Sequence, residues 1–329
     1  MKILVTGSSG HLGEALVRIL QTRSEIEVAG LDIKASPFTS VSGSINDKNC
    51  VADCMEGVDV VYHTATLHKP HVATHSKQEF VDTNISGTLT LLEAATAACV
   101  RSFVFTSTTS VFGDAMRPIA GVPAAWITED VKPLPKNIYG ASKLAAEELC
   151  RLFHRNHGLN CIVLRTSRFF PEEDDDRNKR EKYSDANIKT NEFLYRRVEL
   201  EDVVSAHINA AKRAADLGFG RYIVSATTPF NAADAAQLNT DAVGVLRRYL
   251  PDAFEVYETL GWKMFDQIDR VYVNAAARID LGWTPKYDFR HVLGLHRMGQ
   301  SPLSPIAATV GIKGYHENVF DEGPYPVEE

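Results

Sequence analysis

The two side chains best placed for chemistry in this sequence are Tyr139 and Lys143. The apolar spacing predicts a helix over residues 139–157, and residues four apart on a helix share one face. A phenol exchanges a proton, and a neighbouring ammonium favours its anionic form. The pair has a catalytic spacing and calls for a cofactor. A surface helix with an unrelated Tyr and Lys is the alternative.

The first thirteen residues predict a site for such a cofactor. Residues 2–6 form an apolar run typical of a buried strand, and Gly7, Gly10 and Gly13 follow before a helical pattern begins. Glycines in this context let the backbone approach a pyrophosphate at the helix N-terminus, where unpaired N–H groups and the dipole favour an anion. The motif therefore indicates a dinucleotide site.

Asp32 extends this interpretation to the adenosine end of the cofactor. It closes a second apolar strand over residues 27–31, close to the spacing at which a carboxylate accepts hydrogen bonds from ribose hydroxyls. A carboxylate there repels a 2′-phosphate, so we expect NAD rather than NADP, with Lys34 as the one nearby argument against it. A simple turn with a solvated Asp32 is the alternative.

Strands and helices alternate along the rest of the chain. This order predicts an α/β protein with a doubly wound parallel sheet. Further strands are expected at residues 41–45, 58–62, 102–106, 161–164 and 221–225, and the longer helices at 77–99, 139–157 and 199–215.

The bulk composition is ordinary for a soluble globular protein, and the net charge favours small-molecule partners. The 329 residues are 44% hydrophobic and 23% charged, with a net charge of −7. This charge argues against binding nucleic acid or an anionic membrane. Five scattered cysteines without a Cys-x-x-Cys pair fit reduced thiols. No apolar run is long enough for a signal peptide or a membrane span, so we expect a cytoplasmic protein.

Six motifs in this order resemble the extended short-chain dehydrogenase/reductase superfamily, in particular its NAD-dependent epimerase/dehydratase branch, which includes UDP-glucose 4-epimerase. The resemblance covers about residues 1–300. The motifs are Thr6-Gly7-x-x-Gly10-x-x-Gly13 with Asp32, His63-Thr64-Ala65-Thr66, Asn84-x-x-Gly87-Thr88, Thr106-Ser107-Thr108-Thr109-Ser110-Val111-Phe112-Gly113, Tyr139-x-x-x-Lys143, and Leu281-Gly282-Trp283-Thr284-Pro285.

The resemblance implies the domain organisation. Residues 1–166 would form an NAD-binding Rossmann domain, to which part of 199–225 returns. Residues 167–198 and 226–300 would form a smaller C-terminal α/β substrate region, and 301–329 an extended tail. The resemblance also implies a homodimer that pairs the helix before Cys99 with the helix of Tyr139.

The resemblance assigns roles to individual residues. Tyr139 would be the acid/base, Lys143 its electrostatic partner and a ribose ligand, and Thr108 the hydroxyl that bonds the reacting oxygen. A free phenol has a pKa near 10, which the ammonium and the positive nicotinamide would lower. The expected cofactor contacts are Gly7, Ser9, Gly10, His11, Leu12, Gly13, Asp32, Ile33, Ser44, Ile45, Thr64, Ala65, Thr66, Asn84, Thr106, Ser107, Tyr139 and Lys143.

Three departures from the family pattern narrow the chemistry. Ser44 stands where the family has an Asp that binds adenine. Thr109 and Ser110 replace the Asp-Glu pair of dehydratases, so dehydration is not expected. Arg168 replaces the Asn that contacts the nucleotide diphosphate or sugar, and a UDP-sugar substrate is therefore not simply inherited.

The remaining substrate contacts are expected at His68, Lys69, Thr108, Thr109, Arg168 and Arg197, with Arg196 and Arg270 as further anion contacts. His68, His71 and His75 form one cluster and residues 172–176 an acidic run. The histidine cluster and the acidic run could each be interpreted as a metal site, but we expect no metal in this protein.

These residues predict an NAD-dependent enzyme that oxidises a secondary alcohol on a sugar or nucleotide sugar. The first expectation is a 4-epimerase reaction, in which hydride leaves and returns to the other face. The alternative is a dehydrogenase or carbonyl reductase acting on a sugar or a small hydroxy or keto compound. A non-catalytic NAD-binding redox sensor is a remote third.

Overall fold

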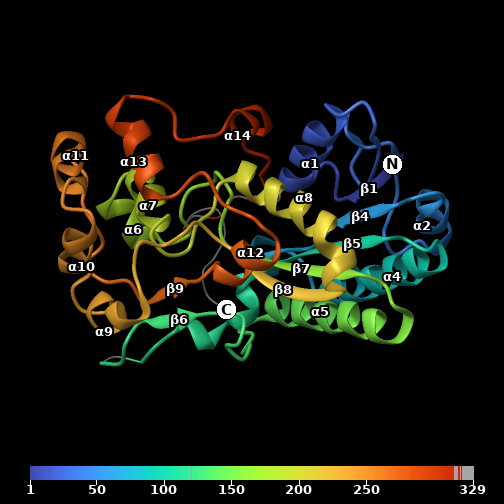
Figure 1. Cartoon of the computed structure of the whole chain (residues 1–329), viewed down its shortest axis with the longest axis horizontal. Coiled ribbons are helices and arrows are strands. Elements are labelled where there is room, and N and C mark those ends of the chain that lie inside the picture. The colour runs from blue at the N-terminus through green and yellow to red at the C-terminus, as the bar shows by residue number, and fades with distance from the viewer. Residues whose placement is uncertain (120, 315–317, 319, 321–329) are drawn as a thin grey trace.

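A seven-stranded parallel sheet forms the centre of the molecule (Figure 1). The computed structural model describes residues 1–119, 121–314, 318 and 320. The strand order is β3-β2-β1-β4-β5-β7-β8, so the order reverses between β1 and β4. The strands are β1 (Lys2–Thr6), β2 (Glu27–Asp32), β3 (Val41–Ser42), β4 (Val60–His63), β5 (Ser102–Thr108), β7 (Cys161–Thr166) and β8 (Phe219–Val224).

The predicted doubly wound parallel sheet is confirmed, and each expected strand is present within a few residues of its predicted ends. The central strands are apolar on both faces because helices cover both faces. Every residue of β4 and of β7 is buried. The carboxyl ends of all these strands therefore meet at one edge, where ligands bind in open parallel sheets.

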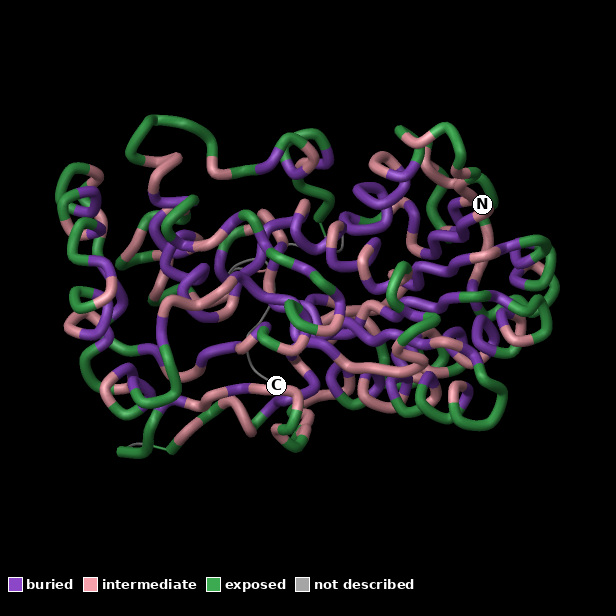
Figure 2. Tube along the Cα trace, viewed as in Figure 1, coloured by how far each residue is buried: buried purple, intermediate pink, exposed green. Residues whose placement is uncertain are grey.

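Two hydrophobic cores lie on opposite faces of the sheet. One packs α1 (His11–Gln21) and α8 (Leu200–Leu217) against β1, β4 and β7. The other packs α2 (Lys48–Met55), α4 (Gly87–Ala97) and α5 (Ile138–His157) against the other face. Figure 2 shows the buried backbone running through these layers between exposed outer turns.

The helix predicted over residues 77–99 is divided in the structure. It consists of α3 (Lys77–Phe80), a π-helical turn (Val81–Ser86) and α4. The helices predicted over 139–157 and 199–215 are α5 and α8, each within two residues of its expected ends.

The smaller part of the molecule lies at the opposite end of Figure 1 from β1 and α2. It has its own core, which is built largely from residues 188–195 and 226–295. A two-stranded parallel sheet, β6 (Ala125–Ile127) with β9 (Arg270–Tyr272), joins it to the rest. Its helices are α6 (Arg177–Lys182), α7 (Asp185–Glu192), α9 (Ala235–Leu238), α10 (Ala242–Tyr249), α11 (Ala253–Leu260) and α13 (Phe289–Arg297).

Residues 301–314 contain a helix where we expected an extended tail; the rest of the predicted tail, apart from residues 318 and 320, lies outside the described residues. The helix is α14 (Pro305–Val310), which packs on α1 and α8 through Ala307 and Val310. Ser304 caps this helix and donates a 2.7 Å hydrogen bond to the buried Glu199. The remaining short helix is α12 (Ala275–Asp280). None of the helices in the described residues is long and apolar enough to cross a membrane.

Candidate active site

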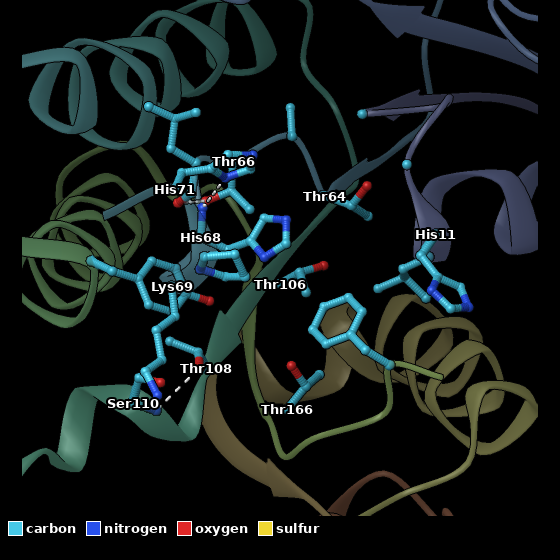
Figure 3. Close-up of a pocket in the computed structure, with 18 of the residues that line it drawn as sticks. His11, Thr64, Thr66, His68, Lys69, His71, Thr106, Thr108, Ser110 and Thr166 are labelled. Atoms are coloured by element: carbon cyan, nitrogen blue, oxygen red, sulfur yellow. Dashed lines mark hydrogen bonds between the residues drawn. The ribbon is translucent and has the colours of Figure 1, made fainter. Parts of the chain in front are cut away.

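A cavity of about 1130 Å³ extends along the carboxyl edge of the sheet. Its wall is formed by the loop after β1, the ends of β2, β4 and β5, the first turn of α5, and the loop after β7. Figure 3 shows side chains from these segments pointing into one space, with His11 on one side and Thr108 on the other. Sixteen of the eighteen predicted cofactor residues lie in this wall; the two that do not are Asn84 and Lys143.

Tyr139 and Thr108 meet at the end of the cavity. Asn137 caps α5 by accepting a 3.1 Å hydrogen bond from the Gly140 amide, which fixes the turn that carries Tyr139. Burial raises the pKa of Tyr139 to about 12, and a hydrogen bond with Thr108 opposes this shift. Thr108 thus stabilises the phenolate form, as a residue aligned with the acid/base should.

Lys143 lies one helical turn after Tyr139 and is almost fully buried. Its ammonium nitrogen is 4.0 Å from the centre of the Phe105 ring, a cation–π contact. Burial lowers the pKa of Lys143 to about 7, while Cys150 and Glu147 raise it. The site therefore holds a phenol and an amine, both of which burial pushes toward their neutral forms.

The glycine loop leaves its backbone open to a ligand. A Cβ on Gly13 would lie 1.9 Å from the Gly7 carbonyl oxygen, and one on Gly7 would lie 2.6 Å from the Ala65 nitrogen. Gly7 also has a φ of +74°, which side chains disfavour. The backbone is packed so closely at these two positions that only glycine fits. The loop lies at the N-terminus of α1, where a pyrophosphate is favoured.

Asp32 lies beside this loop in the cavity wall. Its Oδ2 accepts a 2.9 Å hydrogen bond from the Ser9 amide, and its Oδ1 accepts a 2.8 Å bond from the Lys34 amide. The carboxylate is thus held at the end of β2, the place where a ribose would be bound. The glycine loop and Asp32 together fit a dinucleotide.

Asn84 lies outside the cavity wall, in the π-helical turn. Its side-chain oxygen accepts hydrogen bonds of 2.9 Å from Thr66 Oγ1 and the Leu67 amide, and its nitrogen donates to Ser142 Oγ, also over 2.9 Å. Asn84 therefore ties the loop after β4 to α5. In this structure it positions the wall of the site, and a direct cofactor contact stays a prediction.

The loops after β4 and β7 meet across the cavity. The ring of His68 stacks on Phe170 with 5.5 Å between centroids and 12° between planes. Lys69 Nζ lies 2.8 Å from Asp175 Oδ2. Figure 3 shows His68 and Lys69 directed into the same space as Thr108.

Of the four arginines predicted as contacts, Arg168, Arg196 and Arg270 line the cavity and Arg197 does not. Arg168 lines the cavity, and its guanidinium bonds Asp174 at 2.9 Å and lies 3.5 Å from Asp175. Arg197 is buried outside the wall that the described residues form. It donates to Glu192 at 2.9 Å and to the Phe170 carbonyl at 3.0 Å, so its donors serve the protein interior.

The histidine cluster and the acidic run do not combine into a metal centre. Across the described residues, no group of three or more His, Cys, Asp or Glu side chains is arranged to hold a metal ion. His71 accepts a 3.0 Å hydrogen bond from the His68 amide, and Asp175 pairs with Lys69 and Arg168.

Residues 3–215 match the model of the "NAD dependent epimerase/dehydratase family". The chain belongs to this family. A member of this family is an enzyme, and its cofactor is NAD. The glycine loop and Asp32 would hold NAD, which would supply a hydride acceptor in this site.

Two curated relatives of this chain have different names, a dehydrogenase and an epimerase. The L-arabinose 1-dehydrogenase (NAD(P)(+)) of Haloferax volcanii is 33% identical over 178 residues, which cover 50% of this chain and 65% of the relative. The UDP-glucose 4-epimerase of Streptomyces lividans is 30% identical over 174 residues, or 49% of this chain and 50% of the relative. The chain spans about half the length of the curated relatives it matches.

The fold also matches a short-chain dehydrogenase/reductase superfamily protein from Agrobacterium tumefaciens with bound NAD. The TM-score is 0.63 at 24% identity, and the match covers 91% of this chain and 96% of the other. At this identity the likeness shows the fold alone.

A buried network next to Lys143 and Thr108 was not expected from the sequence. Glu147 accepts a 2.6 Å hydrogen bond from Ser107 and pairs with Arg165. The position of Glu147 could have been predicted, because it lies four residues after Lys143 and so shares the helix face of Tyr139 and Lys143. No local pattern indicates Arg165, which lies on β7.

Proposed function

We propose that this enzyme oxidises a secondary alcohol of a sugar or nucleotide sugar by reversible hydride transfer, with a 4-epimerase type reaction as the first candidate. The observation that carries the proposal is the meeting of Tyr139 and Thr108 at the end of the NAD cavity. Thr108 holds the substrate hydroxyl beside the phenol, and Tyr139 takes its proton as the carbon is oxidised. Lys143 favours the phenolate by its charge.

The UDP-glucose 4-epimerase relative supports the first candidate. In that reaction Tyr139 returns the proton after the hydrogen has been restored to the opposite face of the carbon, so oxidation and reduction cancel. The cavity of about 1130 Å³ is large enough for a dinucleotide together with a sugar substrate.

A net dehydrogenase is the second candidate, and Arg168 favours it. Arg168 stands at the position where the family contacts a nucleotide diphosphate, but carboxylates already surround its guanidinium. A smaller substrate needs no diphosphate contact. The L-arabinose 1-dehydrogenase relative is an example of such chemistry.

The absorbance of NADH during turnover separates the two candidates. Stoichiometric NADH formation excludes the epimerase, and product formation without a net absorbance change excludes the dehydrogenase. Tyr139→Phe should lower kcat by about 100-fold or more while NAD binding persists; Tyr249→Phe, outside the cavity wall, is the matched control. Full activity of Tyr139→Phe would refute the proposed chemistry.

A further inference from the structure

Residues 301–314 bring a cation to the glycine loop. Figure 1 shows α14 beside α1 and α8, and α14 packs against both helices. Gly311 follows α14 with a φ of +64°, a backbone conformation that favours glycine. Two residues later, Lys313 forms part of the cavity wall together with Gly314. The segment therefore contributes a charged side chain to the same cavity as the glycine loop.

Glu14 holds Lys313 at this place. Glu14 directly follows the last glycine of the loop, in the first turn of α1, and is buried. Its Oε2 accepts a hydrogen bond from Lys313 Nζ, 299 residues away in the chain, and its Oε1 lies 2.7 Å from Arg18 Nε. One carboxylate thus faces two cations, and the group as a whole is positive.

The Lys313 ammonium is accessible to a ligand. An ammonium has three N–H donors, and within the described residues its acceptor is Glu14. The Lys313 side chain is 32% exposed, whereas that of Glu14 is 4% exposed. Lys313 can therefore keep its bond to Glu14 and still donate to an acceptor that enters the cavity.

His11 lines the cavity beside Lys313 but adds no charge. Burial and the charge of Lys313 lower the pKa of His11 to about 4, and Glu14 opposes this shift. The His11 ring is therefore neutral near pH 7. Because His11 belongs to the glycine loop, the influence of Lys313 on its pKa also shows that the ammonium lies close to this loop.

The pyrophosphate of NAD needs such a cation here. The N-terminus of α1 offers backbone N–H groups to a phosphate, but a carboxylate in the same turn repels it. A side chain that neutralises Glu14 and also donates to a phosphate oxygen removes this repulsion and adds a charge-assisted hydrogen bond. Lys313 is placed to do both.

We infer that Lys313 is a ligand of the NAD pyrophosphate and that Glu14 holds it in position. Residues 301–314 then complete the cofactor site that the glycine loop and Asp32 begin. The inference goes beyond the hydride transfer proposed above and holds for any substrate of the enzyme, because it concerns the binding of NAD alone.

Titration of the cofactor-free protein with NAD, ADP-ribose and adenosine tests this role. Lys313→Met keeps an unbranched side chain and removes the charge. We expect NAD and ADP-ribose, which both contain the pyrophosphate, to bind about tenfold more weakly, while the binding of adenosine stays the same. Lys313→Arg should retain most of the affinity. An unchanged Kd for NAD, or an equal loss for adenosine, overturns the inference.

A double-mutant cycle separates a direct contact from simple neutralisation of Glu14. Glu14→Gln removes the carboxylate charge and keeps an oxygen that accepts from Lys313. If Lys313 contacts the pyrophosphate, Lys313→Met weakens NAD binding in the Glu14→Gln protein as well. If Lys313→Met has no effect in that protein, Lys313 acts only by neutralising Glu14, and the direct contact is overturned.

Lys286→Met is the matched control. Lys286 is also an exposed lysine paired with a glutamate, Glu201, but it lies outside the cavity wall that the described residues form. Its substitution should leave the Kd for NAD unchanged. Thermal denaturation without NAD shows whether each variant is folded. A Lys313→Met protein that melts at a lower temperature but binds NAD normally would show that Lys313 only anchors residues 301–314, which overturns its role as a ligand.

Discussion

Glu147 and Arg165 form a buried ion pair close to Lys143 and Ser107. Arg165 Nη2 lies 2.7 Å from Glu147 Oε2, and its Nε lies 3.1 Å from Oε1. Glu147 is one helical turn beyond Lys143 and also accepts a hydrogen bond from Ser107, the neighbour of Thr108. Glu147 therefore ties α5 to β7 through Arg165 and to β5 through Ser107, and it places a negative charge near the Lys143 ammonium.

Glu147→Gln should change both stability and pH dependence. It leaves Arg165 buried without a countercharge, which should cost about 3–5 kcal/mol of unfolding free energy. It also removes a charge that raises the pKa of Lys143. Because the ammonium is then lost at lower pH, the alkaline limb of the kcat profile should move to lower pH. Urea denaturation and pH–rate profiles measure the two effects.

Glu148→Gln is the matched control, since Glu148 is the adjacent residue and is about half exposed. The alkaline limb of the kcat–pH profile of Glu148→Gln should not shift. A double variant, Glu147→Leu with Arg165→Leu, should recover stability without recovering the pH profile. An alkaline limb that does not move in Glu147→Gln would show that Glu147 has a structural role alone.

Lys143 should give the cofactor-free protein a distinctive pH dependence of stability. Its pKa is about 7 in the folded protein, against about 10.5 in the unfolded chain. Between these values the unfolded chain binds a proton that the folded protein does not, so stability rises with pH. Below about pH 7 both states carry the charge, and the full cost of burying it remains.

Lys143→Met should remove that rise. We expect the slope of unfolding free energy against pH to fall by up to about 1.4 kcal/mol per pH unit between pH 7.5 and 10. Lys77→Met, at an exposed position on α3, should leave the slope unchanged. Parallel slopes for Lys143→Met and the unaltered protein would mean that Lys143 is not buried as an amine.

Asp32 should select NAD over NADP. Asp32→Asn keeps a side chain able to accept from the Ser9 amide but removes the charge that repels a 2′-phosphate. We expect NAD affinity to fall about tenfold and the preference for NAD over NADP to narrow. Fluorescence titration with both cofactors measures this, with Asp53→Asn on exposed α2 as control. An unchanged NAD/NADP ratio would contradict the assignment.

Two glycine-to-alanine substitutions should have different effects, one on NAD binding and the other on stability. Gly13→Ala places a methyl group 1.9 Å from the Gly7 carbonyl oxygen and should abolish NAD binding by displacing the loop. Gly294→Ala, on helix α13, meets no atom within 4 Å and should stabilise the protein by about 1 kcal/mol. Thermal denaturation with and without NAD measures both. Tight NAD binding by Gly13→Ala would show that the loop adapts.

The sequence by itself determined the features that depend on local spacing. The strand, glycine turn and helix of residues 2–21, the position of Asp32 and the shared face of Tyr139 and Lys143 follow from periodicity, since backbone geometry sets them within a few residues. The order of strands and helices likewise determined the parallel sheet.

Only the tertiary structure decided which polar side chains are available to a ligand. Arg168 and Arg197 look alike in sequence, yet one lines the cavity and the other is buried against Glu192. Lys69 pairs with Asp175, 106 residues away in the chain. Long polar side chains take their partners from whatever the fold brings near, and a local pattern does not contain that information.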